Sequence, residues 1–135
     1  MGEPSPTCIR VVLVDDHPMV RMGLRLSLLS TEGIDVVGEA EDGEEALRVC
    51  AELHPDVVLM DLRLPGLDGA ATTWALQGQV PVPRVVVLTA SYDERLIPDA
   101  LAAGASGYVL KGGTVEELVA AIRSAYGHTH RYAKQ

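Results

Sequence analysis

Three aspartates follow two of the most apolar segments of the chain. Asp15 and Asp16 come directly after the run Ile9–Val14. Asp61 comes directly after Val57–Met60. The second run is uninterrupted and the first is broken only by Arg10, and apolar runs of this length are typical of strands buried on both faces of a parallel sheet. Because a buried carboxylate is costly unless something compensates its charge, these positions indicate acids that are needed for chemistry.

Two further polar residues end apolar runs later in the chain. Thr89 follows Val85–Leu88, and Lys111 follows Tyr108–Leu110. In a parallel α/β sheet, ligands bind beyond the carboxyl ends of the strands. We therefore expect three acids, one hydroxyl and one amine to converge on one rim of the sheet.

Their chemistry is that of a phosphoryl-transfer site. Clustered carboxylates repel one another, and a hard divalent cation such as Mg²⁺, which prefers oxygen ligands, relieves that repulsion. Lys111 and the Thr89 hydroxyl would contact the phosphoryl oxygens. One acid then remains as the nucleophile, and a carboxylate can form an acyl phosphate. Asp61 is the best placed, because the turn signal Pro65–Gly66 after it is expected to expose its side chain.

The rest of the chain alternates between strand and helix patterns. Such alternation predicts an α/β fold with a five-stranded parallel sheet and helices on both faces. Strands are predicted at Ile9–Val14, Ile34–Val37, Val57–Met60, Val85–Leu88 and Tyr108–Leu110, and helices at 18–30, 43–54, 69–77, 94–103 and 115–126.

Several side chains refine these helices. Thr114 with Glu117 forms a capping box at the start of the last helix, and Asp42 starts the second in the same way. Pro98 lies inside the fourth helix, where proline removes a hydrogen bond and clashes with the preceding turn. We expect that helix to begin near Pro98, or to be frayed or kinked over residues 93–97. Trp74 is expected to pack against the sheet.

Composition narrows the class of protein. The chain has 135 residues, 47% of them hydrophobic, which suits one domain with a substantial core. No segment resembles a signal peptide or a membrane span, so a cytoplasmic protein with no membrane partner is expected. Cys8 and Cys50 are then predicted to be unpaired thiols. The net charge of −8 argues against nucleic-acid binding by the chain itself.

Four motifs in order resemble a known family. "VLVDDHP", "VVLMDLRLPGLDG", "VVVLTA" and "GASGYVLK" are similar to the receiver domain of two-component response regulators, in the NarL/LuxR (FixJ-like) subgroup. The resemblance implies a flavodoxin-like (βα)5 fold with strand order 2-1-3-4-5. It covers residues 9–126, which leaves 1–8 as a flexible N-terminal segment and 127–135 as a linker or tail. A DNA-binding effector domain is expected to be absent from this chain.

The resemblance also implies roles for individual residues. It makes Asp61 the phosphoacceptor, phosphorylated by a partner histidine kinase with Mg²⁺. It also implies that the domain forms a homodimer and acts on nucleic acid only through a missing C-terminal helix-turn-helix domain. The other matched positions are Asp16 (direct Mg²⁺ ligand), Asp15 (acting through a metal-bound water), the Arg63 backbone carbonyl (third protein ligand), Thr89 (switch hydroxyl), Lys111 (the family's lysine) and Tyr108 (aromatic switch).

Two positions stand apart from this pattern. Many receivers have proline after the lysine, whereas this chain has Gly112, so a looser backbone is expected there. His17 follows the first two acids, but imidazole suits Zn²⁺ or Cu²⁺ better than Mg²⁺, so His17 is expected to be a bystander.

Other functions remain open on the sequence. A stand-alone receiver could act by protein docking. A Mg²⁺-dependent phosphatase with an aspartyl-phosphate intermediate is disfavoured, because Arg63 occupies the position where such enzymes carry a second acid. A flavin-binding module is disfavoured because the loop after the first strand is acidic. The expected protein is therefore not an enzyme with an external substrate, but a domain that catalyses its own phosphorylation and dephosphorylation.

Overall fold

The chain folds around one five-stranded parallel sheet with the strand order β2-β1-β3-β4-β5. The computed structural model describes residues 8–90 and 95–133, with side chains as far as residue 127. The elements in chain order are β1 Ile9–Val14, α1 Pro18–Leu29, β2 Ile34–Ala40, α2 Gly43–Leu53, β3 Val57–Asp61, α3 Gly69–Leu76, β4 Arg84–Thr89, α4 Ile97–Ala102, β5 Gly107–Leu110 and α5 Val115–Ala133. The predicted flavodoxin-like fold and its strand order are confirmed.

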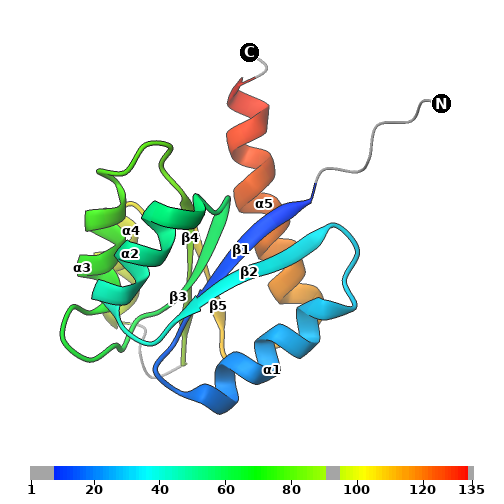
Figure 1. The fold of residues 1–135 in the computed structure, drawn as a ribbon, viewed down its shortest axis with the longest axis horizontal. Helices are drawn as coiled ribbons and strands as arrows, with labels where there is room; N and C mark the ends of the chain where they lie inside the picture. The colour runs from blue at the N-terminus through cyan, green and yellow to red at the C-terminus, as the bar shows by residue number, and fades with distance from the viewer. Residues whose placement is uncertain (1–7, 91–94, 134–135) are drawn as a thin grey trace.

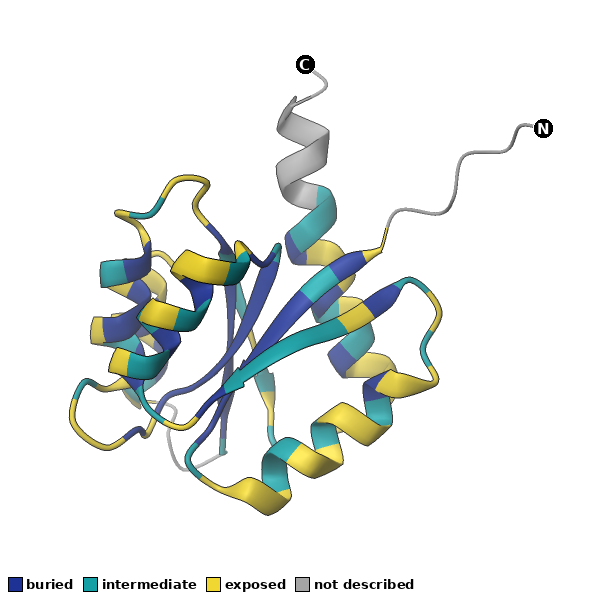
Figure 2. Ribbon diagram, viewed as in Figure 1, coloured by how far each residue is buried: buried dark blue, intermediate teal, exposed yellow. Residues whose placement is uncertain are grey.

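Helices cover both faces of the sheet (Figure 1). α1 and α5 pack on one face, and α2, α3 and α4 pack on the other. Successive residues of a strand point to opposite faces, so Val12 and Val14 contact the α2–α4 side while Val11 and Leu13 contact the α1–α5 side. β3 is buried along its whole length, and β1 and β4 are buried except at Arg10 and Arg84 near their starts (Figure 2), which explains why these strands are apolar without alternation.

Side chains cap both predicted helix starts: Thr114 and Glu117 form a capping box, and at α2 Asp42 caps the helix while Glu45 binds the N–H one residue before the cap. The Glu45 backbone N–H donates to the Asp42 side chain at 2.8 Å, and the Glu45 carboxylate accepts the Glu41 N–H at 2.7 Å. Thr114 and Glu117 exchange the equivalent pair of hydrogen bonds at 3.1 and 2.9 Å. These contacts satisfy N–H groups that the first turn of a helix leaves without a partner.

The fourth helix begins late, as Pro98 indicated. α4 starts at Ile97, after a single 3₁₀ turn at residues 95–96, and Pro98 lies in its first turn. A proline costs little there because the first N–H groups of a helix have no intrahelical partner. The part of the predicted helix at residue 94 lies outside the described residues.

Two local expectations were wrong. α5 continues to Ala133, well beyond its predicted end at 126, so the backbone of residues 127–133 is helical. Trp74 is 72% exposed rather than packed on the sheet. The buried stripe of α3 consists of Gly69, Thr72, Thr73 and Leu76, which places Trp74 on the opposite side of the helix.

The register of the sheet brings the strand ends level. Val14 of β1 pairs with Met60 of β3, so Asp15 and Asp61, the next residues, reach the same row. The Lys111 N–H then donates to the Thr89 carbonyl at 2.8 Å, directly after the last pair of β4 and β5. Hydrogen bonding between parallel strands therefore carries the polar residues to one rim.

The backbone of α3 lies against the end of β3. A Cβ added at Gly69 would come within 2.4 Å of the Asp61 carbonyl oxygen and 2.7 Å of Leu62 Cα. Both atoms belong to the backbone, so they cannot move aside as a flexible side chain would. Gly69 thus allows the close packing that holds the Asp61 segment in place.

Within the described chain, no helix is both long enough and apolar enough to span a bilayer. Cys8 and Cys50 are both free thiols, as predicted, and burial raises the pKa of Cys50 to about 12.

Replacing Gly69 should therefore test how tightly α3 holds the site. We expect Gly69→Ala to lower the free energy of unfolding by about 1–3 kcal/mol, because the added methyl group overpacks a rigid contact. Gly23, which is exposed in the middle of α1 with open space around it, is the matched control. Gly23→Ala should raise stability by about 0.5–1 kcal/mol through helix propensity. Urea denaturation measures both, and equal stability of Gly69→Ala and wild type would show that α3 is free to shift.

Candidate functional site

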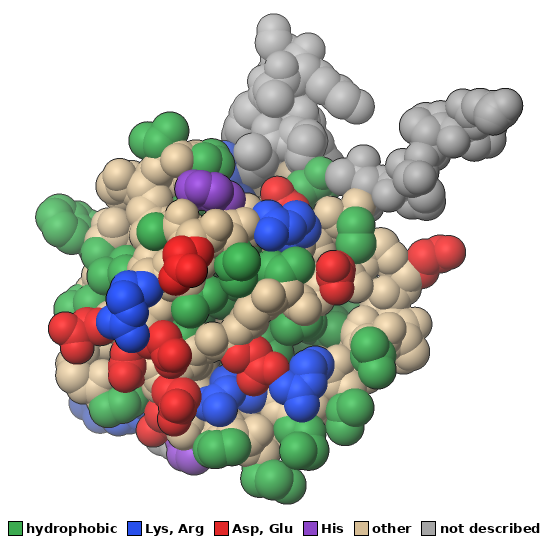
Figure 3. Space-filling model, in the orientation of Figure 1, with side chains coloured by type: hydrophobic (Ala, Val, Ile, Leu, Met, Phe, Trp, Pro, Cys, Tyr) green, Lys and Arg blue, Asp and Glu red, His purple; other side chains and the backbone are tan. Residues whose placement is uncertain are grey.

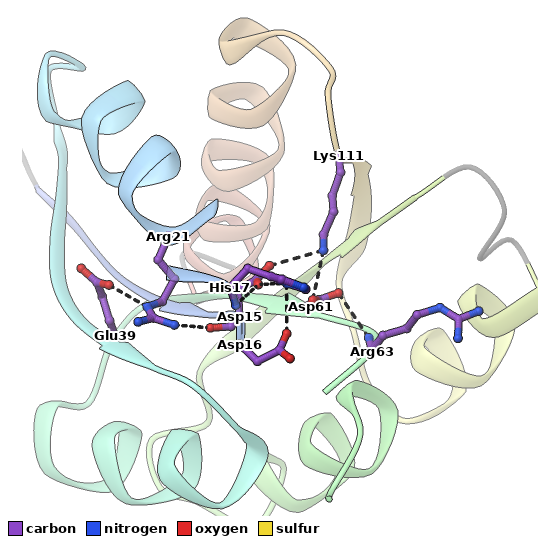
Figure 4. A network of polar contacts seen from close by, with 8 residues as sticks. All are labelled: Asp15, Asp16, His17, Arg21, Glu39, Asp61, Arg63 and Lys111. Carbon is purple, nitrogen blue, oxygen red and sulfur yellow. Dashed lines mark hydrogen bonds and ion pairs between the residues drawn. The ribbon is translucent and has the colours of Figure 1, made fainter. Parts of the chain in front are cut away.

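Acidic side chains meet at the carboxyl ends of β1 and β3 (Figure 4). Asp15 and Asp61 are buried, with 0% and 1% of each residue exposed, whereas Asp16 lies nearer the surface. Together with His17, one ligand atom from each of these residues lies within 4.8 Å of all the others. The three acids predicted from the sequence are thus brought together.

Lys111 brings positive charge to two of these carboxylates. Its Nζ lies 3.0 Å from Asp61 Oδ2 and 3.3 Å from Asp15 Oδ2. Desolvation raises the pKa of Asp61, and the nearby Asp15 charge acts in the same direction, while the Lys111 contact opposes them without cancelling them. For Lys111, burial alone would lower the pKa, but contacts with Asp61 and Asp15 outweigh burial and the pKa is raised. Lys111 is therefore held as a cation inside the site.

The backbone after Lys111 adopts a conformation that a lysine–proline sequence could not adopt. Gly112 has a φ of 83°, and a Cβ added there would meet no atom within 4 Å. Proline is restricted to φ near −65°, so it could not adopt this conformation. The turn after β5 therefore has a left-handed residue, Gly112, where many receivers have proline.

His17 lies inside the cluster rather than beside it. Its backbone N–H donates to Asp15 Oδ1 at 2.8 Å, and its Nδ1 lies 3.0 Å from the same oxygen and 3.1 Å from Asp16 Oδ1. His17 is also the N-cap residue of α1, so the Asp15 side chain binds the residue at the helix start instead of capping the first turn. The sequence signal was available, since His17 directly follows both acids.

Sequence reasoning did not single out a group of charged residues behind the cluster. Arg21, one turn into α1, donates to the Asp15 backbone carbonyl at 2.5 Å and pairs with Glu39 of β2 at 3.0 Å. Arg25 also pairs with Glu39. These contacts tie the ends of β1 and β2 to α1, and so they fix the backbone that carries Asp15 (Figure 4).

Of the other predicted site residues, Arg63 contacts the acids through its backbone, and Thr89 and Tyr108 lie on the neighbouring strands. Arg63 donates its backbone N–H to Asp61 Oδ1 at 3.2 Å, while its side chain extends away from the cluster (Figure 4). Thr89 is buried at the end of β4, and its hydroxyl donates to the Ala90 carbonyl at 3.0 Å. Tyr108 of β5 is 51% exposed. Thr89 thus adjoins the site through the backbone, and Tyr108 faces outward.

The turn after Asp61 does not expose it, contrary to expectation. The carboxylate is buried although Pro65 and Gly66 are exposed. The reason is tertiary, since the Lys111 side chain reaches across from the end of β5 and contacts Oδ2. An incoming group would have to displace this cover before it reached Asp61.

The donor set fits a magnesium ion. In the described part of the chain, three carboxylate oxygens have almost no solvent exposure, and they belong to Asp15 (Oδ2), Asp16 (Oδ1) and Asp61 (Oδ2). Lys111 lies against the first and the last and compensates part of their charge, but three clustered carboxylates leave an excess of negative charge that is costly. Mg²⁺ prefers oxygen ligands and is commonly bound by one or two carboxylates. Asp15, Asp16 and Asp61 are the side chains that would hold it.

Comparison with families of known proteins gives one match over most of the chain. The family model of the response regulator receiver domain matches residues 11–123. The transcriptional regulatory protein LiaR of Bacillus subtilis is 44% identical over 117 residues, which cover 87% of this chain and 56% of LiaR. The response regulator GacA of Pseudomonas aeruginosa is 43% identical over 118 residues, which cover 87% of this chain and 55% of GacA. The chain therefore spans little more than half the length of these relatives.

Solved structures agree with the fold. The NarL signal receiver domain of Mycobacterium tuberculosis superimposes with a TM-score of 0.84 at 38% identity, over 90% of this chain and 98% of that domain. A LuxR-family two-component response regulator from Aurantimonas sp. SI85-9A1 gives a TM-score of 0.84 at 39% identity, over 90% of this chain and 87% of that one.

The raised pKa of Asp61 predicts a dependence of stability on pH. In the unfolded chain this carboxyl group titrates near 3.8, and in the folded protein it titrates higher. Above the folded pKa, ionised Asp61 therefore destabilises the fold, and below 3.8 the effect disappears because both states are protonated. Without divalent ions, Asp61→Asn should raise the free energy of unfolding at pH 7.5 by on the order of 1 kcal/mol, with the gain shrinking toward pH 3.8.

Asp68 provides the matched control for urea denaturation at both pH values. It is exposed, and it caps α3 by accepting the Ala71 N–H at 2.8 Å. Asparagine also caps helices well, so Asp68→Asn should leave stability nearly unchanged. A loss of stability in Asp61→Asn at pH 7.5 would contradict the assignment of desolvation as the dominant effect.

Proposed function

Because the chain belongs to the family of response regulator receiver domains, we propose that it is phosphorylated on Asp61 by a histidine kinase in the presence of Mg²⁺. The observation that supports this most directly is the position of Asp61. Its carboxylate is buried at the end of a central strand, with a second buried acid beside it and a lysine 3.0 Å away. A carboxylate in such surroundings suits reversible formation of an acyl phosphate.

In the transfer step, an oxygen of Asp61 attacks the phosphorus of the kinase's phosphohistidine. The new O–P bond forms as the P–N bond breaks, and the bonding electrons stay with the imidazole. Mg²⁺, when bound by the acids, neutralises negative charge on the phosphoryl oxygens. Lys111 is shared between Asp61 and Asp15, so it can turn to a phosphoryl oxygen while it keeps a carboxylate partner. That movement also uncovers Asp61. The Arg63 carbonyl would supply the third protein ligand to Mg²⁺, and Asp15 would act through a water.

The switch would pass through Thr89. Its hydroxyl now donates to the Ala90 carbonyl, and a phosphoryl oxygen on Asp61 is a stronger, charged acceptor for the same proton. Thr89 turning inward would leave space that exposed Tyr108 can fill. The phosphoryl group then shifts a two-state equilibrium by binding one state better than the other.

The output we propose is homodimerisation, through the face of α4, β5 and α5 or through α1 and α5. It would control transcription in the cytoplasm through a DNA-binding domain outside these 135 residues. LiaR is a transcriptional regulatory protein by name, which supports this output. Acidic and basic side chains are mixed over the face in Figure 3, and the net charge of −8 gives the chain little attraction for phosphate backbones.

Labelling with acetyl phosphate tests the phosphosite. Wild-type protein with Mg²⁺ should gain one phosphoryl group, visible by mass spectrometry of the intact chain and removed by hydroxylamine, which cleaves acyl phosphates. Asp61→Asn should reduce labelling at least a hundredfold, on the order of 3 kcal/mol of lost transition-state stabilisation. Asp68→Asn keeps the charge change but lies outside the cluster, so it should label normally. Full labelling of Asp61→Asn would place the phosphosite elsewhere.

The switch is tested separately by Thr89→Ala. This variant should still be labelled on Asp61, because all three acids, including Asp61 itself, are intact. It should lose most of the change in oligomer size that beryllofluoride with Mg²⁺ produces in wild type, as measured by light scattering. Thr72→Ala, which removes a buried hydroxyl from α3 away from the cluster, controls for loss of packing. A full response in Thr89→Ala would show that the signal takes another route.

A further inference from the structure

The imidazole of His17 lies among oxygens that suit a metal ion, although Mg²⁺ has little use for imidazole. We propose that the acidic cluster also takes a divalent transition-metal ion, such as Co²⁺, with His17 Nδ1 as a direct ligand beside Asp15 and Asp16. Such an ion would compete with Mg²⁺. The inference rests on one part of the proposed function, namely that these carboxylates hold a divalent cation.

Distances between donor atoms carry the argument first. Nδ1 of His17 lies 3.0 Å from Asp15 Oδ1 and 3.1 Å from Asp16 Oδ1. Bonds of ~2.1 Å to a six-coordinate ion place neighbouring ligand atoms ~3.0 Å apart, because they subtend a right angle at the metal. One atom of Asp61 is also within 4.8 Å of the other three donors. The distances from Nδ1 to the two oxygens are therefore compatible with neighbouring ligands of one ion.

The balance of charge is a second, independent observation. Asp15 Oδ2 and Asp61 Oδ2 are buried, and both lie against the same Lys111 ammonium, at 3.3 and 3.0 Å. Lys111 is the cation next to them, and one ammonium is divided between two carboxylates. The negative charge left uncompensated favours a second cation at this place.

The tautomer of His17 can adapt to such a ligand. Its side chain is 64% exposed, so Nε2 has access to water. In the tautomer of the neutral ring that carries its proton on Nε2, Nδ1 offers its lone pair to a metal. No residue has to move out of the buried layer for this tautomer to form. Oxygen with imidazole donors suits Co²⁺, Ni²⁺ and Zn²⁺, which also bind such sites more tightly than Mg²⁺ in general.

Replacing His17 should affect the binding of a transition metal and of Mg²⁺ differently. Replacing its ring removes one direct ligand of a transition metal. It removes no oxygen from the magnesium site, because the backbone N–H to Asp15 Oδ1 stays in any substituted residue. A supporting role for the ring, by contrast, would weaken both ions alike.

Calorimetric titration of the full chain with Co²⁺, and separately with Mg²⁺, tests this. The reference protein carries Cys8→Ser, His128→Asn and His130→Asn, so that His17 and His54 are its only histidines; Cys50 is buried, and burial raises the pKa of its thiol to about 12. In that protein we compare His17→Gln with His54→Asn. His54 is the matched control, because its φ of 49° is one that asparagine adopts readily. Ring-proton resonances shifted by Co²⁺ provide a readout independent of affinity.

We expect His17→Gln to weaken Co²⁺ binding by about 10- to 100-fold, to change Mg²⁺ binding less than about threefold, and to abolish one set of shifted ring-proton resonances. His54→Asn should change none of these. Unchanged Co²⁺ affinity, or equal loss for both ions, would overturn the inference and leave the proposed function standing. Failure of the reference protein to bind Mg²⁺ would instead count against the proposed function, while His17-dependent Co²⁺ binding would still support the inference.

Discussion

The electrostatic conflict between Asp15 and Asp61 governs the structure around it. Two carboxylates that are almost completely removed from water lie side by side, and burial is the largest contribution to the raised pKa of Asp61. Such an arrangement costs free energy, and it persists because Lys111 and the surrounding fold hold it in place. The excess negative charge of the carboxylates favours the binding of a cation at this site, or a covalent modification that removes the charge of one carboxylate.

The sheet makes this conflict unavoidable. Because Val14 pairs with Met60 in parallel strands, the next residues, Asp15 and Asp61, lie at the same rim of the sheet. The order β2-β1-β3 places their two strands in direct contact. The contact of Gly69 with the Asp61 carbonyl then closes α3 against that rim, and Arg21 ties the Asp15 carbonyl to α1 and β2. Rigid elements on both sides therefore prevent the acids from drifting apart, as a preorganised site requires.

The cover over Asp61 links chemistry at the rim to the outer surface. The Lys111 side chain contacts the acids, and its backbone N–H donates to the Thr89 carbonyl. The two residues therefore connect the ends of β4 and β5 directly. Tyr108 lies on β5, three residues before Lys111, which directly follows that strand. The short segment 108–111 therefore contains both a residue of the buried site, Lys111, and an exposed side chain, Tyr108. His17 adds a donor of a different kind to the opposite side of the same cluster.

Much of this was determined by the sequence alone. Apolar runs ended by Asp15, Asp61, Thr89 and Lys111, together with alternating helix patterns, were enough to predict a parallel sheet and the meeting of the acids with the lysine, because the carboxyl ends of parallel strands share one rim. The strand order came from the resemblance to receiver domains. Pro98 similarly determined where α4 begins. The roles assigned to these side chains remain predictions. Only the tertiary structure decided that Asp61 is covered, that Trp74 faces solvent, and that His17 touches two acids. Burial and side-chain direction depend on what other elements bring to a position, and a reading of one segment at a time does not contain that information.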